Sequence, residues 1–302
     1  MNNLCEIEKS LFNEFDRNSN TKIVFILASP RTGSTPLYEA IVKSTSFPYI
    51  SNLTNTFYPD HPIIGMAIQH GIKATFNLKS NFGKTDHIFC VSEGSGPFTN
   101  WYGGGHPSQI VSKSVIKNKE DHLRKTVNSI YNLYGKPLVV KNAWNCFRVS
   151  DIARVFPDAK FLWLKRDIGD AAKSDLEARY VTKDDPNKWN SATPWNFEEL
   201  LKKPHIQQVV ENQYEFNIAI KNQLELLSDD SWNEIFYEDF VKNPTHVMAN
   251  ICAFLECPEK PSNTLVDLIK TEDVNLPSGD GDDIDSYINE NAERLNFLRQ
   301  NN

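Results

Sequence analysis

The chain alternates between short runs of hydrophobic residues and amphipathic stretches. The hydrophobic runs occur at residues 22–28, 136–142, 160–167 and 232–240, and most are followed by a segment with helical spacing of apolar positions. A continuous apolar run of this length is typical of a strand that is buried on both faces of a parallel sheet. The alternation therefore predicts an α/β fold of three layers, αβα, built on a doubly wound parallel sheet.

Two segments interrupt the alternation. Residues 50–115 and 183–205 are rich in Gly, Pro, Asn and aromatic residues and show no clear periodicity. A long stretch of this kind inside a compact domain is usually functional, as in active-site lids. We therefore expect a single domain over residues 1–302, with substrate-lid segments around 50–115 and 183–205. The acidic stretch 272–290 lacks the ligand spacing of a calcium loop, and we interpret it as a solvated loop.

Composition and charge exclude several classes of protein. Hydrophobic residues make up 40% of the 302 residues, which is enough for a sizeable core. The net charge of −7 argues against a protein that binds nucleic acid non-specifically, because such proteins need an excess of positive charge. The N-terminal residues lack the apolar core of a secretory signal, and no run reaches the length of a membrane span. These features predict a cytoplasmic protein that contacts neither membrane nor nucleic acid.

The cysteines indicate neither a disulfide framework nor a metal site. There are five of them, which is an odd number, and they are scattered along the chain. No histidine stands beside them at the spacing of metal ligands. We therefore expect reduced, mostly buried thiols.

The turn after the first hydrophobic run has the character of a phosphate-binding loop. Residues 28–35 read ASPRTGST and lead from the expected strand into a helix, whose N-terminal N–H groups can bind an anion. Compared with the Walker pattern GxxxxGK followed by Ser or Thr, aligned on Gly33, Thr35 keeps the hydroxyl. Ser34, however, replaces the lysine that bridges the β- and γ-phosphates. Arg31 supplies a cation elsewhere, which suits a ligand with a 5′-phosphate and one further transferable group.

A second cluster argues against the alternative, an ordinary strand–turn–helix corner. Arg166 ends the third hydrophobic run, and Ser174 follows eight residues later on the next expected helix. A guanidinium at the end of a strand and a hydroxyl on the next helix can both reach one phosphate. The carboxyl ends of the strands of a doubly wound sheet meet at the crevice where ligands bind. The loop and the Arg166–Ser174 pair therefore predict one ligand with two separated phosphates.

These two motifs resemble the 5′-phosphosulfate loop and the 3′-phosphate motif of sulfotransferases that use 3′-phosphoadenosine 5′-phosphosulfate (PAPS). Residues 136–174 are similar to that family, and residues 235–255 resemble its tyrosine-bearing strand and the following helix. The resemblance implies a P-loop-like sulfotransferase fold. It also implies in-line transfer of a sulfuryl group from PAPS to a hydroxyl or amine, with release of 3′-phosphoadenosine 5′-phosphate (PAP). No metal is implied, because the sulfuryl donor needs none.

The resemblance implies roles for individual residues. Arg31 matches the loop cation that neutralises charge on the phosphate as the sulfuryl group departs, and Lys141 matches a lysine near that group. Arg166 and Ser174 match the ligands of the 3′-phosphate, and Tyr237 matches a residue that contacts the nucleotide. The residues expected to bind the nucleotide are Arg31, Thr32, Gly33, Ser34, Thr35, Arg166, Ser174 and Tyr237.

The sequence departs from the family where the catalytic base is expected. Pro36 and Ala143 stand at the positions of a stacking tryptophan and a catalytic histidine of the cytosolic branch. The glutamate that other branches carry after the loop is also missing. We expect the base in the irregular segment, in the order Glu93, His106 and His61, although each of these can also be an ordinary loop residue. Glycines beside the first two would allow a ligand to approach the backbone closely.

The acceptor is expected to be a small molecule of secondary metabolism. The carboxylates Glu93 and Asp60 favour a polar or cationic acceptor, and at this level the chain resembles toxin-tailoring sulfotransferases of the saxitoxin type. Two alternatives stay open: a P-loop kinase that phosphorylates a small molecule with ATP, and a nucleotide-binding protein without catalytic activity. Ser34 in place of the Walker lysine argues against the kinase, whereas Ala143 keeps the second alternative open. The sequence leaves the oligomeric state open.

Overall fold

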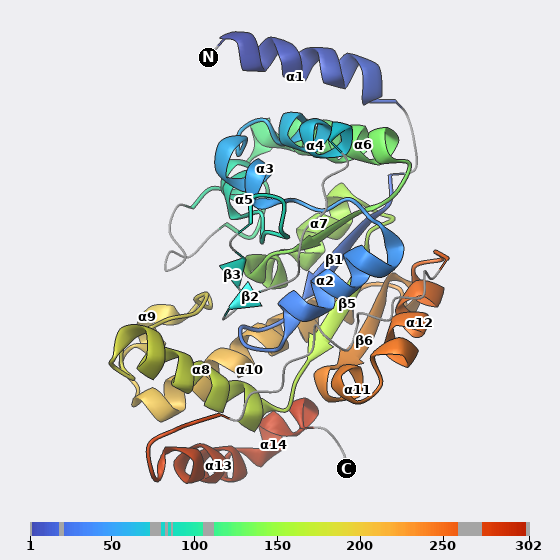
Figure 1. Ribbon diagram of the computed structural model, residues 1–302. Coiled ribbons are helices and arrows are strands. Elements are labelled where there is room, and N and C mark those ends of the chain that lie inside the picture. Colours follow the sequence, from blue (N-terminus) through green and yellow to red (C-terminus); the bar gives the residue numbers. More distant parts are fainter. Residues whose placement is uncertain are drawn as a thin grey trace.

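The computed structural model shows a parallel sheet with helices on both faces (Figure 1). It describes residues 2–17, 21–72, 80–81, 84–85, 87–104, 112–258 and 274–299. Within these residues the sheet has four parallel strands in the order β4-β1-β5-β6. They are β1 (Ile23–Leu27), β4 (Leu138–Lys141), β5 (Lys160–Lys165) and β6 (Trp232–Phe236). Each strand lies within one of the hydrophobic runs, so the predicted α/β fold with a parallel sheet is confirmed.

Strand β1 lies inside the sheet, between β4 and β5, and separates two hydrophobic cores. Its register pairs Phe25 with Phe161 of β5. Because successive side chains of a strand point to opposite faces, Phe25 and Leu27 belong to one core and Val24 and Ile26 to the other. Both faces of the sheet are therefore buried, which is why the strand reads as a continuous apolar run.

Helices form the two outer layers. One core packs against α6 (Glu120–Tyr134), α7 (Val149–Val155) and α10 (His205–Leu224). The other packs against α2 (Ser34–Thr45) and α12 (Pro244–Phe254). This arrangement confirms the predicted three-layer αβα architecture.

Several further elements are short. They are α11 (Tyr237–Lys242), α14 (Ala292–Leu295), the antiparallel pair β2 (Ser80–Asn81) and β3 (Lys84–Thr85), and the 3-10 helices η1 (Lys117–Lys119), η2 (Ala143–Phe147), η3 (Asp229–Ser231) and η5 (Asn296–Leu298). None of the described helices combines the length and the apolar character needed to cross a bilayer.

The acidic C-terminal stretch forms a helix where the sequence predicts a loop. Helix α13 (Asp280–Glu290) buries Ile284 and Ile288 against α8 (Ile168–Lys183) and α10. The two isoleucines stand at i and i+4 and therefore lie on one face of the helix. Acidic residues in the first turn are favourable at a helix N-terminus. The interpretation as a solvated loop is therefore wrong for residues 280–290.

Short helices occupy much of the described part of residues 50–115. They are α3 (Asn52–Phe57), α4 (Pro62–Gly71) and α5 (Ser95–Tyr102), and α9 (Phe197–Leu200) lies in the second irregular segment. These helices are too short to show a clear period, and most of them contain Gly, Pro or Asn, which is why the sequence predicts irregular structure there. The role of both segments as lids stays a prediction.

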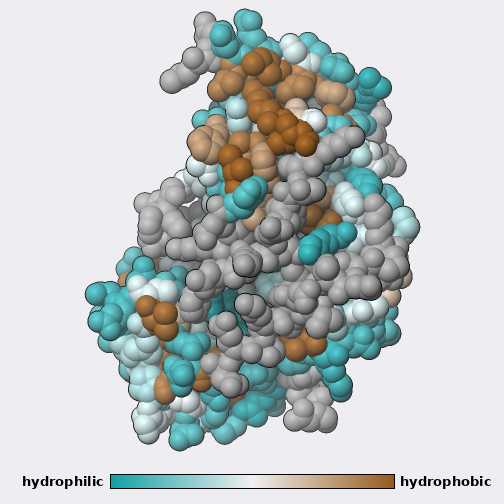
Figure 2. Space-filling model, in the orientation of Figure 1, coloured by the Kyte–Doolittle hydropathy of each residue, from teal (hydrophilic) through white to brown (hydrophobic). Residues whose placement is uncertain are grey.

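Helix α1 (Asn2–Phe15) lies at one end of the molecule and packs against α4 and α6 (Figure 1). Figure 2 shows that hydrophobic side chains gather at this end. The exposed hydrophobic residues of α1, α3 and α4 are Leu4, Ile7, Phe57, Ile68 and Ile72. Most of α1 is solvent-exposed, so few side chains hold the helix in place.

Candidate active site

The phosphate loop joins β1 to α2 through two residues in the left-handed backbone region. Arg31 has a φ of 66° and Gly33 a φ of 80°. Gly33 adopts this conformation readily, whereas a residue with a side chain such as Arg31 does so at a cost in free energy that surrounding contacts must offset. A Cβ added at Gly33 would overlap the ring of Tyr237, so only glycine fits here. Ser34 and Thr35 begin α2, and their N–H groups lie at a helix N-terminus.

Buried polar side chains stabilise the loop by hydrogen bonds. The Thr32 hydroxyl donates to the carbonyl oxygen of Ser29 at 2.6 Å. From α10, the side-chain amide of Asn217 donates to the Ser29 hydroxyl at 3.2 Å, and that of Gln213 donates to the carbonyl oxygen of Pro30 at 3.0 Å. The sequence analysis missed both α10 residues. The available signal was the placing of amide side chains on the buried face of a helix.

The structure brings four of the predicted nucleotide-binding residues together. The guanidinium of Arg31 donates to the hydroxyl of Ser174 through Nε at 3.3 Å and Nη2 at 3.2 Å. Arg166 donates through Nη1 to the carbonyl oxygen of Arg31 at 3.0 Å, and its guanidinium lies 5.0 Å from the ring centre of Tyr237. Arg166 directly follows β5 and Tyr237 directly follows β6, so the carboxyl ends of β1, β5 and β6 form this site.

The electrostatics of the site suit an anion. Burial lowers the pKa of the Arg31 guanidinium, the carboxylate of Asp175 partly offsets this, and the positive charge of Arg166 lowers the pKa further. The Nε atom of Arg166 is buried and has no hydrogen-bond partner among the described residues. A phosphate between the two arginines would accept that hydrogen bond and relieve the repulsion between their charges. The residues present therefore fit a nucleotide phosphate.

Lys141 and Glu93, which the sequence predicts separately, meet at the end of β4. The ammonium group of Lys141 forms an ion pair with the Glu93 carboxylate. The neighbouring Asn142 donates through Nδ2 to the carbonyl oxygen of Glu93 at 3.1 Å, which fixes the backbone in front of α5. The Glu93 side chain stays 40% exposed, whereas that of Lys141 is mostly buried. A carboxylate that is reachable and held beside a cation suits proton transfer, but its role as the base stays a prediction.

The other two candidate bases lie outside this arrangement. His61 stands at the start of α4, and its Nδ1 lies 2.8 Å from the Glu8 carboxylate of α1. Its described contacts are with α1 and not with the phosphate loop. His106 lies outside the described residues.

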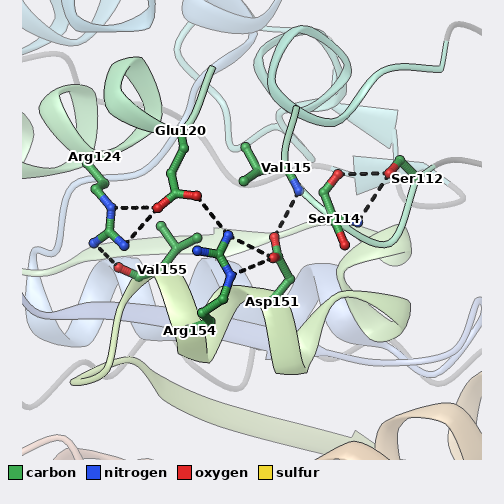
Figure 3. A network of polar contacts seen from close by, with 8 residues as sticks. All are labelled: Ser112, Ser114, Val115, Glu120, Arg124, Asp151, Arg154 and Val155. Carbon is green, nitrogen blue, oxygen red and sulfur yellow. Dashed lines mark hydrogen bonds and ion pairs between the residues drawn. The ribbon is translucent and has the colours of Figure 1, made fainter. Parts of the chain in front are cut away.

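The C-terminal end of the first predicted lid segment is held to the body of the protein. The backbone N–H of Val115 donates to the Asp151 carboxylate at 2.9 Å, and Arg154 joins Asp151 to Glu120 of α6 (Figure 3). The buried guanidinium of Arg148 donates to the carbonyl oxygen of Ser112 at 3.1 Å. These contacts anchor the chain that follows residues 105–111.

A loop without the Walker lysine, two arginines and a tyrosine at the strand ends form a candidate anion site in a P-loop-like α/β fold. The model of the sulfotransferase family matches residues 24–261, which is more than half of the chain. The protein therefore belongs to the sulfotransferase family.

Two solved structures show the same fold. The sulfotransferase STF1 from Mycobacterium tuberculosis H37Rv has a TM-score of 0.55 and 12% identity, over 98% of this chain and 82% of that chain. The sulfotransferase STF9 from Mycobacterium avium has a TM-score of 0.53 and 10% identity, over 95% of this chain and 72% of that chain. At such low identity the likeness shows the fold alone. No curated protein gives a significant match.

Proposed function

We propose that the protein transfers a sulfuryl group from PAPS to a hydroxyl or amine of a small molecule. Membership of the sulfotransferase family supports the reaction class. The observation that carries the choice of donor is the convergence of Arg31, Arg166 and Ser174. Two guanidinium groups beside a phosphate loop suit a nucleotide with a second phosphate, because each guanidinium can donate two hydrogen bonds to one phosphate.

Different elements hold different parts of the nucleotide. The backbone N–H groups and hydroxyls of residues 32–35 bind the 5′-phosphate at the start of α2. Arg166 and Ser174 bind the 3′-phosphate, and Tyr237 contacts the nucleotide from the side of β6. PAPS supplies the sulfuryl group. The charges of Arg31 and Lys141 stabilise the negative charge that develops on the departing phosphate.

Glu93 is proposed as the catalytic base. Its carboxylate is 40% exposed, so an acceptor hydroxyl or amine can reach it and give up its proton. The ion pair with Lys141 keeps this carboxylate at the end of β4, beside the strand that carries the phosphate loop. His106 is retained as an alternative base, and His61 is the least favourable because Glu8 already engages it.

We place the acceptor among polar or cationic small molecules of secondary metabolism. The support for a polar or cationic acceptor is the partly exposed carboxylate of Glu93, which lies beside Lys141 at the end of β4. Asp60, the other carboxylate that favours such an acceptor in the sequence, precedes His61 at the start of α4.

Calorimetric titration tests the donor. PAP, AMP and ATP with Mg²⁺ are titrated into the wild-type protein and into Arg166→Ala. We expect PAP to bind well and AMP and ATP weakly. Arg166→Ala should weaken PAP binding by about tenfold to hundredfold, because hydrogen bonds to a charged phosphate are lost. Arg17→Ala, which removes an exposed arginine at the end of α1, is the matched control and should bind PAP like the wild type.

Two results would contradict this proposal. If ATP with Mg²⁺ bound and PAP did not, the loop would belong to a kinase. If Arg17→Ala lost as much affinity as Arg166→Ala, the loss would reflect overall charge and not a phosphate site.

A further inference from the structure

A cluster of nucleophilic and titratable side chains lies where α1 meets α4, apart from the nucleotide site. The thiol sulfur of Cys5 on α1 is exposed and lies 4.0 Å from Nε2 of His61, within hydrogen-bond range for sulfur. The other ring nitrogen of His61, Nδ1, lies 2.8 Å from the carboxylate of Glu8. A thiol, an imidazole and an orienting carboxylate in this order are the arrangement that activates cysteine nucleophiles.

Glu8 fixes which nitrogen of His61 faces the thiol. Burial raises the pKa of the Glu8 carboxyl, but hydrogen bonds from His122 and His61 outweigh this effect and lower the pKa below 4.5. At neutral pH the group is therefore a carboxylate, which only accepts hydrogen bonds, so the neutral imidazole of His61 carries its proton on Nδ1. Nε2 is then left with its lone pair directed at Cys5.

A second set of contacts holds the carboxylate itself. Nε2 of His122 lies 3.2 Å from the other oxygen of Glu8. Nδ1 of His122 accepts the indole N–H of Trp101 at 2.9 Å, and Trp101 is 2% exposed. An indole can only donate, so this bond also fixes the tautomer of His122. The orientation of His61 is thus determined from the buried core outward to the exposed thiol.

We propose that Cys5 is an activated thiol and the site at which this protein exchanges with low-molecular-weight disulfides. The thiol gives its proton to Nε2 of His61, and the thiolate attacks one sulfur of the disulfide. The sulfur–sulfur bond of the reagent breaks, a mixed disulfide with Cys5 forms, and the other half leaves as a thiolate. The position of Cys5 in the first turn of a helix also favours the thiolate.

The other cysteines are less accessible to solvent than Cys5. Cys90, Cys146 and Cys252 are buried, and burial raises the pKa of the Cys146 thiol to about 12. Cys257 is half-buried, and burial raises its pKa as well. Because the thiolate is the reactive form, modification at Cys5 should come first.

The test measures the rate of reaction with 4,4′-dithiodipyridine, a neutral disulfide whose approach does not depend on charge. Peptide mapping by mass spectrometry identifies the modified residue. The matched control is a double variant, Cys5→Ser with Ser10→Cys, which moves the thiol to another exposed position of α1. We expect Cys5 to be modified first and about tenfold faster than the control thiol. His61→Gln should reduce the rate at Cys5 to that of the control.

A second variant separates activation of the thiol from docking of α1. His122→Gln removes the second imidazole but leaves a side-chain amide that can still donate a hydrogen bond to Glu8, so it should change the rate at Cys5 only slightly. Equal losses in His61→Gln and His122→Gln would show that docking alone matters and would overturn the proposal. So would a Cys5 that reacts no faster than the control thiol. The assay needs no nucleotide, so its outcome is independent of the proposed sulfotransferase activity.

Discussion

Among single residues, Glu93 has the most demanding role in the proposed reaction, that of the catalytic base. In the proposed reaction Glu93 accepts a proton from the acceptor while it stays paired with Lys141. We expect Glu93→Gln to lower kcat by about a hundredfold or more, because glutamine has the same shape but cannot accept the proton. PAP binding, measured by calorimetry, should stay close to that of the wild type. The turnover is measured with an acceptor found by screening with PAPS.

The control for this substitution is Glu225→Gln. Glu225 is an exposed glutamate that is also paired with a lysine, Lys221, and its replacement should leave kcat unchanged. Full activity in Glu93→Gln would move the search for the base to His106. A parallel loss of PAP binding would mean that Glu93 supports the nucleotide site rather than the proton transfer.

At the scale of elements, helix α8 links the nucleotide site to the second predicted lid. One turn after Ser174, the fully buried Arg179 donates to the carbonyl oxygen of Pro186 at 3.1 Å and stacks on Trp189 at 4.6 Å. The hydroxyl of Ser191 in the same segment donates to the Asp175 carboxylate at 3.4 Å. A helix that contacts both the phosphate site and this segment can couple their positions.

We expect Arg179→Met to release the segment 184–196. Methionine keeps much of the buried volume but makes none of the hydrogen bonds of the guanidinium, so the segment loses its anchor. Amide hydrogen exchange in 184–196 should become faster, while Arg31 and Ser174 still bind PAP. Lys183→Met, at the exposed end of the same helix, is the control. Unchanged exchange in Arg179→Met would show that the segment is held by other contacts.

At the scale of the whole molecule, the buried Glu8 fastens α1 to α4 and α6 through the two histidines. Its pKa in the folded protein lies below 4.5, so the unfolded chain binds more protons in the range between the two values. Stability from this carboxylate is therefore complete above pH 4.5 and is lost as the pH falls through the folded pKa.

Replacement of Glu8 should show this dependence directly. We expect Glu8→Gln to lower the free energy of unfolding by about 1–3 kcal/mol at pH 7, because the hydrogen bonds to a charged group are weakened. The difference from the wild type should shrink below about pH 4. Urea unfolding at pH 7 and below about pH 4 measures this difference in free energy. Glu6→Gln on the exposed side of α1 is the control. A difference that is the same at both pH values would assign the effect to packing.

Much of the fold and part of the site follow from local patterns. The apolar runs predict the strands, because burial on both faces leaves few polar positions in them. Arg31, Arg166 and Ser174 could be chosen from the sequence since each lies just after a strand or on the next helix, whereas Tyr237 came from the resemblance to the family. A parallel sheet necessarily gathers those positions at one edge. The sequence by itself therefore determined the architecture and the cations of the candidate site.

Only the tertiary structure decided which distant side chains meet. Gln213 and Asn217 support the phosphate loop from a helix far along the chain. Amide side chains on the buried face of that helix indicate polar contacts, but no local pattern identifies the loop as their partner. The pairing of Lys141 with Glu93, and of His61 with Glu8, depends on how the short helices of residues 50–115 pack. Such contacts join residues that are remote in sequence, and their geometry exists only once the core has formed.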